Sequence, residues 1–165
     1  MERGAATLFA RFLTGNWRLP ETAIATGDPD KREPDALLHF GIEVTSVYYT
    51  DDDAREVREL FDDLDKGIRR RTKIRAVPTA NLSFVERTQT LLDGKATRRY
   101  SVPTYLVLDA RLAGVHSADE GPSLVAQLRV PAAARFEGVF LLLNRNAARG
   151  PGGVEFFEVT QRAAT

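Results

Sequence analysis

Apolar and polar residues alternate along residues 35–49 in the manner of a β-hairpin. One parity is mostly apolar, and its members are Ala36, Leu38, Phe40, Ile42 and Val44. If His39-Phe40-Gly41 forms a three-residue turn with a left-handed glycine, Leu38 pairs with Ile42. Asp35 then lies opposite Thr45 and diagonal to Glu43, at roughly 7–8 Å between backbones.

The rest of the chain alternates between helical and strand-like patterns. Apolar residues at helical spacing predict helices over 5–13, 53–73, 82–92 and 120–128, and buried or alternating runs predict strands over 104–109, 138–144 and 154–160. Ser83 and Glu86 suit the start of the helix over 82–92, and Asp93-Gly94 suits its end. Residues 16–34 are predicted to form a loop or, around Thr22-Ala23-Ile24-Ala25, a weak edge strand. This order predicts an α/β fold: one domain over 1–165 with a mixed central sheet flanked by helices.

Composition narrows the functional classes. At 165 residues the chain fits one ordinary domain, and 23 basic against 23 acidic residues leave no net charge to indicate a nucleic-acid partner. The absence of cysteine excludes disulfides, a thiolate nucleophile and a cysteine zinc site. The N-terminus lacks a signal-peptide pattern, and the longest apolar run, 139–143, is too short to cross a bilayer. We therefore expect a cytoplasmic protein without a membrane partner.

The hairpin also carries the strongest chemical signal. Glu43 and Thr45 share a face because they are two residues apart, and any turn of odd length keeps Asp35 on that face as well. Two carboxylates so placed can share one divalent cation. Magnesium prefers carboxylate oxygens and retains several waters, and it can activate water against a phosphodiester.

At these residues the chain resembles the PD-(D/E)xK nuclease superfamily. Pro34-Asp35 matches the family's Pro-Asp element and Glu43 its second acid, in the form PDALLHFGIEVT. The resemblance covers mainly residues 34–48 and implies a restriction-endonuclease-like core. It further implies a Mg²⁺- or Mn²⁺-dependent nuclease with Asp35 and Glu43 as metal ligands. DNA is the expected substrate, with RNA and a homodimeric state left open.

The chain departs from the family at one position. Thr45 stands where the family places a lysine, and losing a positioned acid or base costs about 10²–10⁴ in rate. Some family members supply the cation from another element, for which Arg55, Arg58, Lys66 and Lys73 are candidates. The resemblance also implies an acid from the first helix, with Glu2 as the first candidate and Glu21 as the second.

Basic residues cluster after the helix predicted over 53–73. Arg69, Arg70, Arg71 and Lys73 could hold nucleic-acid phosphates, and Arg98-Arg99 form a smaller cluster. The alternative is a solvated helix end whose cations complement the helix dipole. Two hypotheses follow: a divergent, catalytically impaired metal-dependent nuclease, or an inactive module of the same fold that binds nucleic acid or protein. The structural alternative is that a Pro-Asp turn and one strand glutamate occur together by chance.

Overall fold

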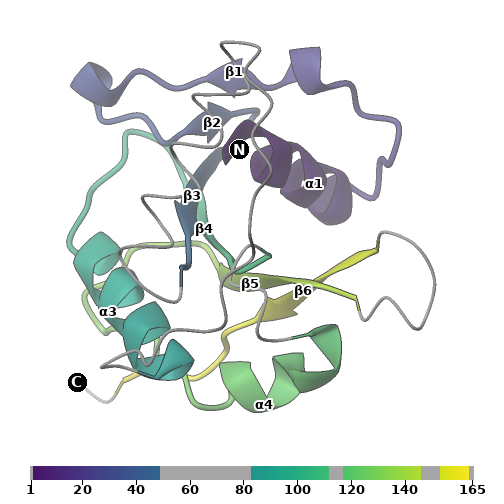
Figure 1. Ribbon diagram of the computed structural model, residues 1–165. Coiled ribbons are helices and arrows are strands. Elements are labelled where there is room, and N and C mark those ends of the chain that lie inside the picture. The colour runs from purple at the N-terminus through teal and green to yellow at the C-terminus, as the bar shows by residue number, and fades with distance from the viewer. Residues whose placement is uncertain (1, 49–82, 112–116, 146–152, 164–165) are drawn as a thin grey trace, which may run out of the picture.

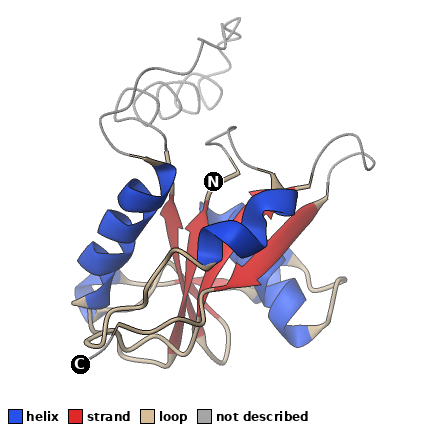
Figure 2. Cartoon of the chain, turned by 90° about the horizontal axis from the view of Figure 1, so that it is seen from below, coloured by secondary structure: helices blue, strands red, loops and turns tan. Residues whose placement is uncertain are grey.

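The computed structural model describes residues 2–48, 83–111, 117–145 and 153–163. Over these ranges helices cover both faces of one six-stranded sheet (Figures 1 and 2). The elements are α1 (Glu2–Thr14), η1 (Glu21–Ala23), β1 (Ala25–Thr26), η2 (Pro29–Lys31), β2 (Ala36–Leu37), β3 (Gly41–Ser46), α3 (Phe84–Ala96), β4 (Thr104–Asp109), η3 (Ala118–Glu120), α4 (Gly121–Val125), β5 (Val139–Asn144) and β6 (Val154–Glu158). The helix predicted over 53–73 lies outside the described residues.

The six strands lie in the sheet in the same order as in the chain. β3, β4 and β5 run parallel to one another, whereas β1, β2 and β6 pair antiparallel with their neighbours. Parallel neighbours need a crossover connection, and α3 and α4 lie in the two crossovers. The predicted α/β fold with a mixed sheet flanked by helices is confirmed. Among the described residues, no helix has the length and apolar character that a membrane span requires.

α1 covers one face of the sheet. Ala5, Ala6, Phe9 and Ala10 of this helix are fully buried, as expected for a short helix that presents one apolar stripe. Phe9 packs against the rings of Phe140 and Phe156 at centroid distances of 5.0 and 5.4 Å. Ile42 and Val44 of β3 belong to the same cluster.

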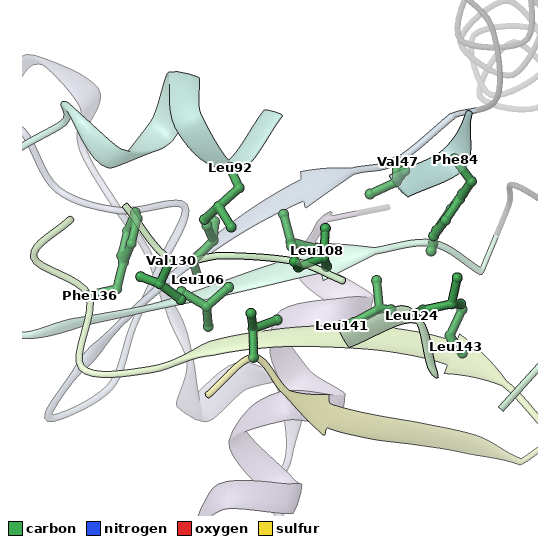
Figure 3. Close-up of a cluster of buried hydrophobic side chains, with 14 of the residues drawn as sticks. Val47, Phe84, Leu92, Leu106, Leu108, Leu124, Val130, Phe136, Leu141 and Leu143 are labelled. Atoms are coloured by element: carbon green, nitrogen blue, oxygen red, sulfur yellow. The ribbon is translucent and has the colours of Figure 1, made fainter. Parts of the chain in front are cut away.

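α3 and α4 cover the opposite face, where Leu106, Leu108 and Leu141 of the sheet meet Leu92 of α3 and Leu124 of α4 (Figure 3). Because successive strand residues point to opposite faces, Glu43 and Thr45 face α3 while Ile42 and Val44 face α1. The alternation in β3 therefore places one acidic side chain in a buried layer.

The predicted start of α3 is confirmed and its predicted end is wrong. The Ser83 hydroxyl accepts a hydrogen bond from the Glu86 N–H, and the Glu86 carboxylate accepts one from the Ser83 N–H at 2.7 Å, which completes a capping box. The helix continues through Asp93-Gly94 to Ala96. Leu92 and Ala96 are both buried on the sheet, so packing of the last turn outweighs the low helix propensity of glycine.

The hairpin exists, but its register differs from the prediction by two residues. Leu37 pairs with Gly41 and Ala36 with Ile42, so the loop is 38–40. Continued by one residue, this register places Asp35 opposite Glu43, where the prediction placed Asp35 opposite Thr45. A shift of two preserves the face of every side chain.

Gly41 is a glycine for a reason other than turn geometry. Its backbone is not left-handed, since among the described glycines only Gly15 has a positive φ. A Cβ atom at Gly41 would instead overlap Pro34 Cγ and Thr104 Oγ1. Close approach of the residues before β2 and at the start of β4 therefore requires glycine here.

The remaining boundaries follow the predictions closely. The strand over 104–109 is confirmed, β5 and β6 begin within one residue of the predicted positions, and α1 extends the predicted helix at both ends. α4 is shorter than the predicted helix over 120–128, because η3 precedes it and the chain leaves the helix after Val125. The weak edge strand predicted around 22–25 is wrong for most of that stretch, where η1 lies, and the two-residue β1 follows it.

Gly41→Ala is expected to lower the free energy of unfolding by about 1–3 kcal/mol, because the new methyl group overpacks the β2–β3–β4 contact. Gly94→Ala is the matched control: no atom lies within 4 Å of its added Cβ, and alanine in a helix should stabilise by about 0.5–1 kcal/mol. Urea unfolding measures both changes. Equal stability of the Gly41 variant and the wild type would contradict the close approach.

Candidate functional site

Glu43 is a buried carboxylate in the middle of β3, with 2% of its surface exposed. Its Oε1 atom accepts a hydrogen bond from the Lys95 ammonium, and the Arg98 guanidinium donates to the same oxygen at 3.3 Å. Lys95 lies in the last turn of α3, and Arg98 follows the end of that helix. A buried carboxylate needs such partners, because desolvation of an unpaired charge is costly.

The two cations differ in exposure. The Lys95 side chain is 19% exposed and closes over Glu43, whereas the Arg98 side chain is 57% exposed and reaches Glu43 from the solvent side. One carboxylate with two cations leaves the cluster of Glu43, Lys95 and Arg98 with one net positive charge. We call these three residues the Glu43 cluster.

Asp35 lies just before β2 and has a structural role of its own. Its Oδ2 atom accepts a hydrogen bond from the Val44 N–H at 2.7 Å. Because the pairing of β2 with β3 ends at Ala36, the side chain supplies the acceptor that the strand would otherwise provide. Asp35 also borders a depression of about 400 Å³, lined by Arg3, Pro34 and others, so solvent reaches its surroundings.

Two hydroxyl groups near Glu43 are buried without a hydrogen-bond partner among the described residues. They are Thr45 Oγ1, on the same face of β3, and the Tyr100 hydroxyl. Burial raises the pKa of Tyr100 above its usual value, the Glu43 carboxylate raises it further, and Arg98 acts in the opposite direction. Tyr100 is therefore close to both members of the ion pair and keeps its proton at neutral pH.

The predicted metal site stays a prediction, and the described residues contribute two carboxylates to it. Asp35 lies just before β2 and Glu43 in its partner β3, and magnesium in proteins is often bound by one or two carboxylates and several waters. Glu43 already holds two cations, and the described residues contain no group of three or more acidic, histidine or cysteine side chains that could hold a metal ion. The donor set fits a water-rich magnesium site and does not fit a fully protein-ligated one.

Several predicted site residues remain untested. Glu2 is the first residue of α1, and its side chain is outside the described atoms. Glu21 instead pairs with Arg3 at 3.2 Å. The basic residues that lie outside the described ranges are Arg55, Arg58, Lys66, Arg69, Arg70, Arg71 and Lys73.

Sequence reasoning missed Lys95 and Tyr100, and it treated Arg98 only as part of a basic pair. Ending the helix at Asp93-Gly94 removed Lys95 from it. Helical spacing carried the signal, because Lys95 follows Leu92 by three residues and Leu91 by four, and so lies on the side that faces the sheet. Contact with Glu43, 52 residues away in the chain, required the folded structure.

A second buried carboxylate, Asp109 at the end of β4, shows what a self-contained pair looks like. Arg111 Nε and Nη2 donate to its two oxygens at 2.8 and 2.7 Å, and the Arg111 N–H adds a third bond. One anion here meets one cation in a bidentate arrangement. Asp109 is thus satisfied locally, in contrast to the Glu43 cluster.

Comparison of the chain with profiles of known protein families, with curated protein sequences and with solved structures finds no match. The resemblance of the hairpin to the PD-(D/E)xK superfamily therefore stays a prediction. The strongest chemical feature of the site is the contact of Lys95 with Glu43.

Asp35→Ala is expected to lower the free energy of unfolding by about 1–3 kcal/mol, because the Val44 N–H loses its acceptor. Asp35→Asn keeps an acceptor oxygen and should lose clearly less. Urea unfolding of both variants measures the difference. Equal losses would mean that the charge of Asp35, rather than its hydrogen bond, supports the hairpin.

Tyr100 should make stability fall with rising pH above 10. In the unfolded chain the hydroxyl ionises near its model value of 10.0, whereas the raised pKa keeps it protonated in the folded protein. Above pH 10 only the unfolded state releases this proton, so the free energy of unfolding decreases as pH rises. Tyr100→Phe lacks this decrease. Groups common to both proteins cancel in the comparison, and parallel pH dependences would refute the burial of the hydroxyl.

Proposed function

We propose that this protein is a divergent metal-dependent nuclease that hydrolyses phosphodiester bonds of DNA. Its site comprises Asp35 and Glu43 of the β2–β3 hairpin and Lys95 of α3. The observation that carries the proposal is the contact between the Lys95 ammonium and the buried Glu43 carboxylate. This contact brings a lysine to Glu43, the second acid of the motif. The hairpin sequence by itself has no such lysine.

Lys95 can take the role of the lysine that the motif has at the position of Thr45. Thr45 occupies the strand position two residues after Glu43, and its hydroxyl has no partner among the described residues. A cation from α3 reaches the same carboxylate from above the sheet, because α3 packs on the face that Glu43 and Thr45 share. In this proposal Lys95 replaces the motif lysine in function and Thr45 marks its former position.

Each residue then has a defined role. Magnesium or manganese bound to Asp35 and Glu43 would polarise the phosphodiester of the substrate and lower the pKa of an attacking water. The Val44 N–H holds Asp35 in place, and Lys95 orients the Glu43 carboxylate. The Lys95 ammonium also offers positive charge to a phosphate on which negative charge develops.

The second candidate is an inactive module of the same kind that binds nucleic acid or protein. Two observations favour it: Glu43 already carries two cations, and no third metal-binding side chain joins Asp35 and Glu43 among the described residues. In this case the Glu43 cluster stabilises the packing of α3 on β3, and nucleic acid binds through basic residues such as Arg69, Arg70, Arg71 and Lys73.

Digestion of plasmid DNA with Mg²⁺ or Mn²⁺ tests the nuclease proposal. Asp35→Asn, Glu43→Gln and Lys95→Met should each lower the cleavage rate by about 10²-fold or more. Lys31→Met removes an exposed lysine that pairs only with Asp28 among the described residues, and it should leave cleavage unchanged. Parallel digestions of structured DNA and of RNA show which nucleic acid the protein prefers as substrate.

Two results separate the candidates. Metal-dependent cleavage that the three site variants abolish and the Lys31 control retains would establish the nuclease. No cleavage of any substrate by the wild type, together with salt-sensitive binding of DNA, would instead establish the binding module. Calorimetric titration with Mn²⁺ adds a readout without catalysis, since Asp35→Asn and Glu43→Gln should both weaken metal binding.

A further inference from the structure

The Glu43 cluster has more cationic donors than its one carboxylate uses. Lys95 and Arg98 both donate to the same oxygen, Oε1, and these are the ion pairs that the described residues provide for them. An ammonium has three N–H donors and a guanidinium five, so most of their donors are not spent on Glu43. A purely structural pair needs one cation, as Asp109 and Arg111 show.

A separate observation points in the same direction. The Tyr100 hydroxyl is buried close to Glu43 and Arg98, which both act on its pKa, but it makes no hydrogen bond of normal geometry among the described residues. Thr45 Oγ1 on β3 also has no hydrogen-bond partner there. Unpartnered buried polar groups are rare in folded proteins and call for an explanation. Hydroxyl groups beside two cations offer hydrogen-bond donors and positive charge to the oxygens of an anion.

We infer that Lys95, Arg98 and Tyr100 form a binding site for a phosphate group beside Glu43. Arg98 is the outermost of the three, with 57% of its side chain exposed, and its bond to Glu43 is a single contact of 3.3 Å. It can therefore turn toward a phosphate that arrives from solvent while Lys95 keeps Glu43 paired. A guanidinium is suited to this task, because its planar donors match two phosphate oxygens.

The choice of ligand rests on the proposed function, in which the phosphate belongs to a nucleic-acid strand. Inorganic phosphate shares the same chemistry and is the simplest probe. The site can be tested in EDTA, without metal and without cleavage. Failure of the nuclease proposal and failure of the phosphate site are therefore distinguishable.

The test titrates the full chain with inorganic phosphate, and separately with a short DNA oligonucleotide, at constant ionic strength in EDTA. Calorimetry gives the affinities. Arg98→Gln should weaken both ligands by about tenfold or more, because a charge-assisted hydrogen bond is lost. Tyr100→Phe should weaken them by roughly threefold and leave folding intact, since the hydroxyl it removes makes no hydrogen bond of normal geometry among the described residues.

Arg99→Gln is the matched control. Arg99 is the exposed neighbour of Arg98, it carries the same charge, and it has no ion pair with Glu43. Retained affinity in this variant together with loss in Arg98→Gln supports the site. Equal loss in both variants would overturn it in favour of a diffuse basic surface, and so would the absence of measurable binding of both ligands to the wild type. Binding of phosphate but not of the oligonucleotide would overturn nucleic acid as the source.

Discussion

A carboxylate in the middle of a buried sheet layer has to be neutralised, and the α3 side of this fold is organised around that requirement. Glu43 lies between β4 and the hairpin partner β2, and α3 covers it. The last turn of α3, which continues through Gly94 to Ala96, carries Lys95 to the carboxylate. Removal of either partner would leave a charge in a poorly solvated layer, so sheet and helix depend on each other through this pair.

The same contact can serve structure and chemistry together. To neutralise one buried glutamate, one lysine would be enough. In the Asp109–Arg111 pair, one cation neutralises one carboxylate in this way. The Glu43 cluster exceeds this one-to-one pairing, because it has a second cation, which is more than half exposed. Two nearby hydroxyls, of Thr45 and Tyr100, have no hydrogen-bond partner within the part of the chain that the structure describes. The positive charge of the cluster is therefore exposed to solvent at Arg98. It is this excess, more than the burial of Glu43 itself, that favours a binding or catalytic role over a packing role.

Asp35 shows the same overlap of roles at the other strand. Its carboxylate continues the ladder beyond the last backbone pair of β2 and β3, and it also borders a depression open to solvent. The hairpin pattern predicted the pairing of the two strands but placed the turn incorrectly, because Gly41 suggested a left-handed residue. The glycine is required by Pro34 and Thr104, which belong to segments before β2 and at the start of β4. A tertiary contact thus determined a residue that local turn rules had explained differently.

The sequence by itself determined the elements whose signals are local: the strand over 104–109, the capping box of α3, the apolar stripe of α1 and the face of β3 that Glu43 and Thr45 share. Periodicity and capping act over a few residues, so they can be read directly from the chain. The register of the hairpin, the last turn of α3 and the partners of Glu43 were decided only by the tertiary structure. Lys95 and Arg98 are 52 and 55 residues from Glu43, and their approach depends on how α3 packs across the sheet, which no local pattern encodes.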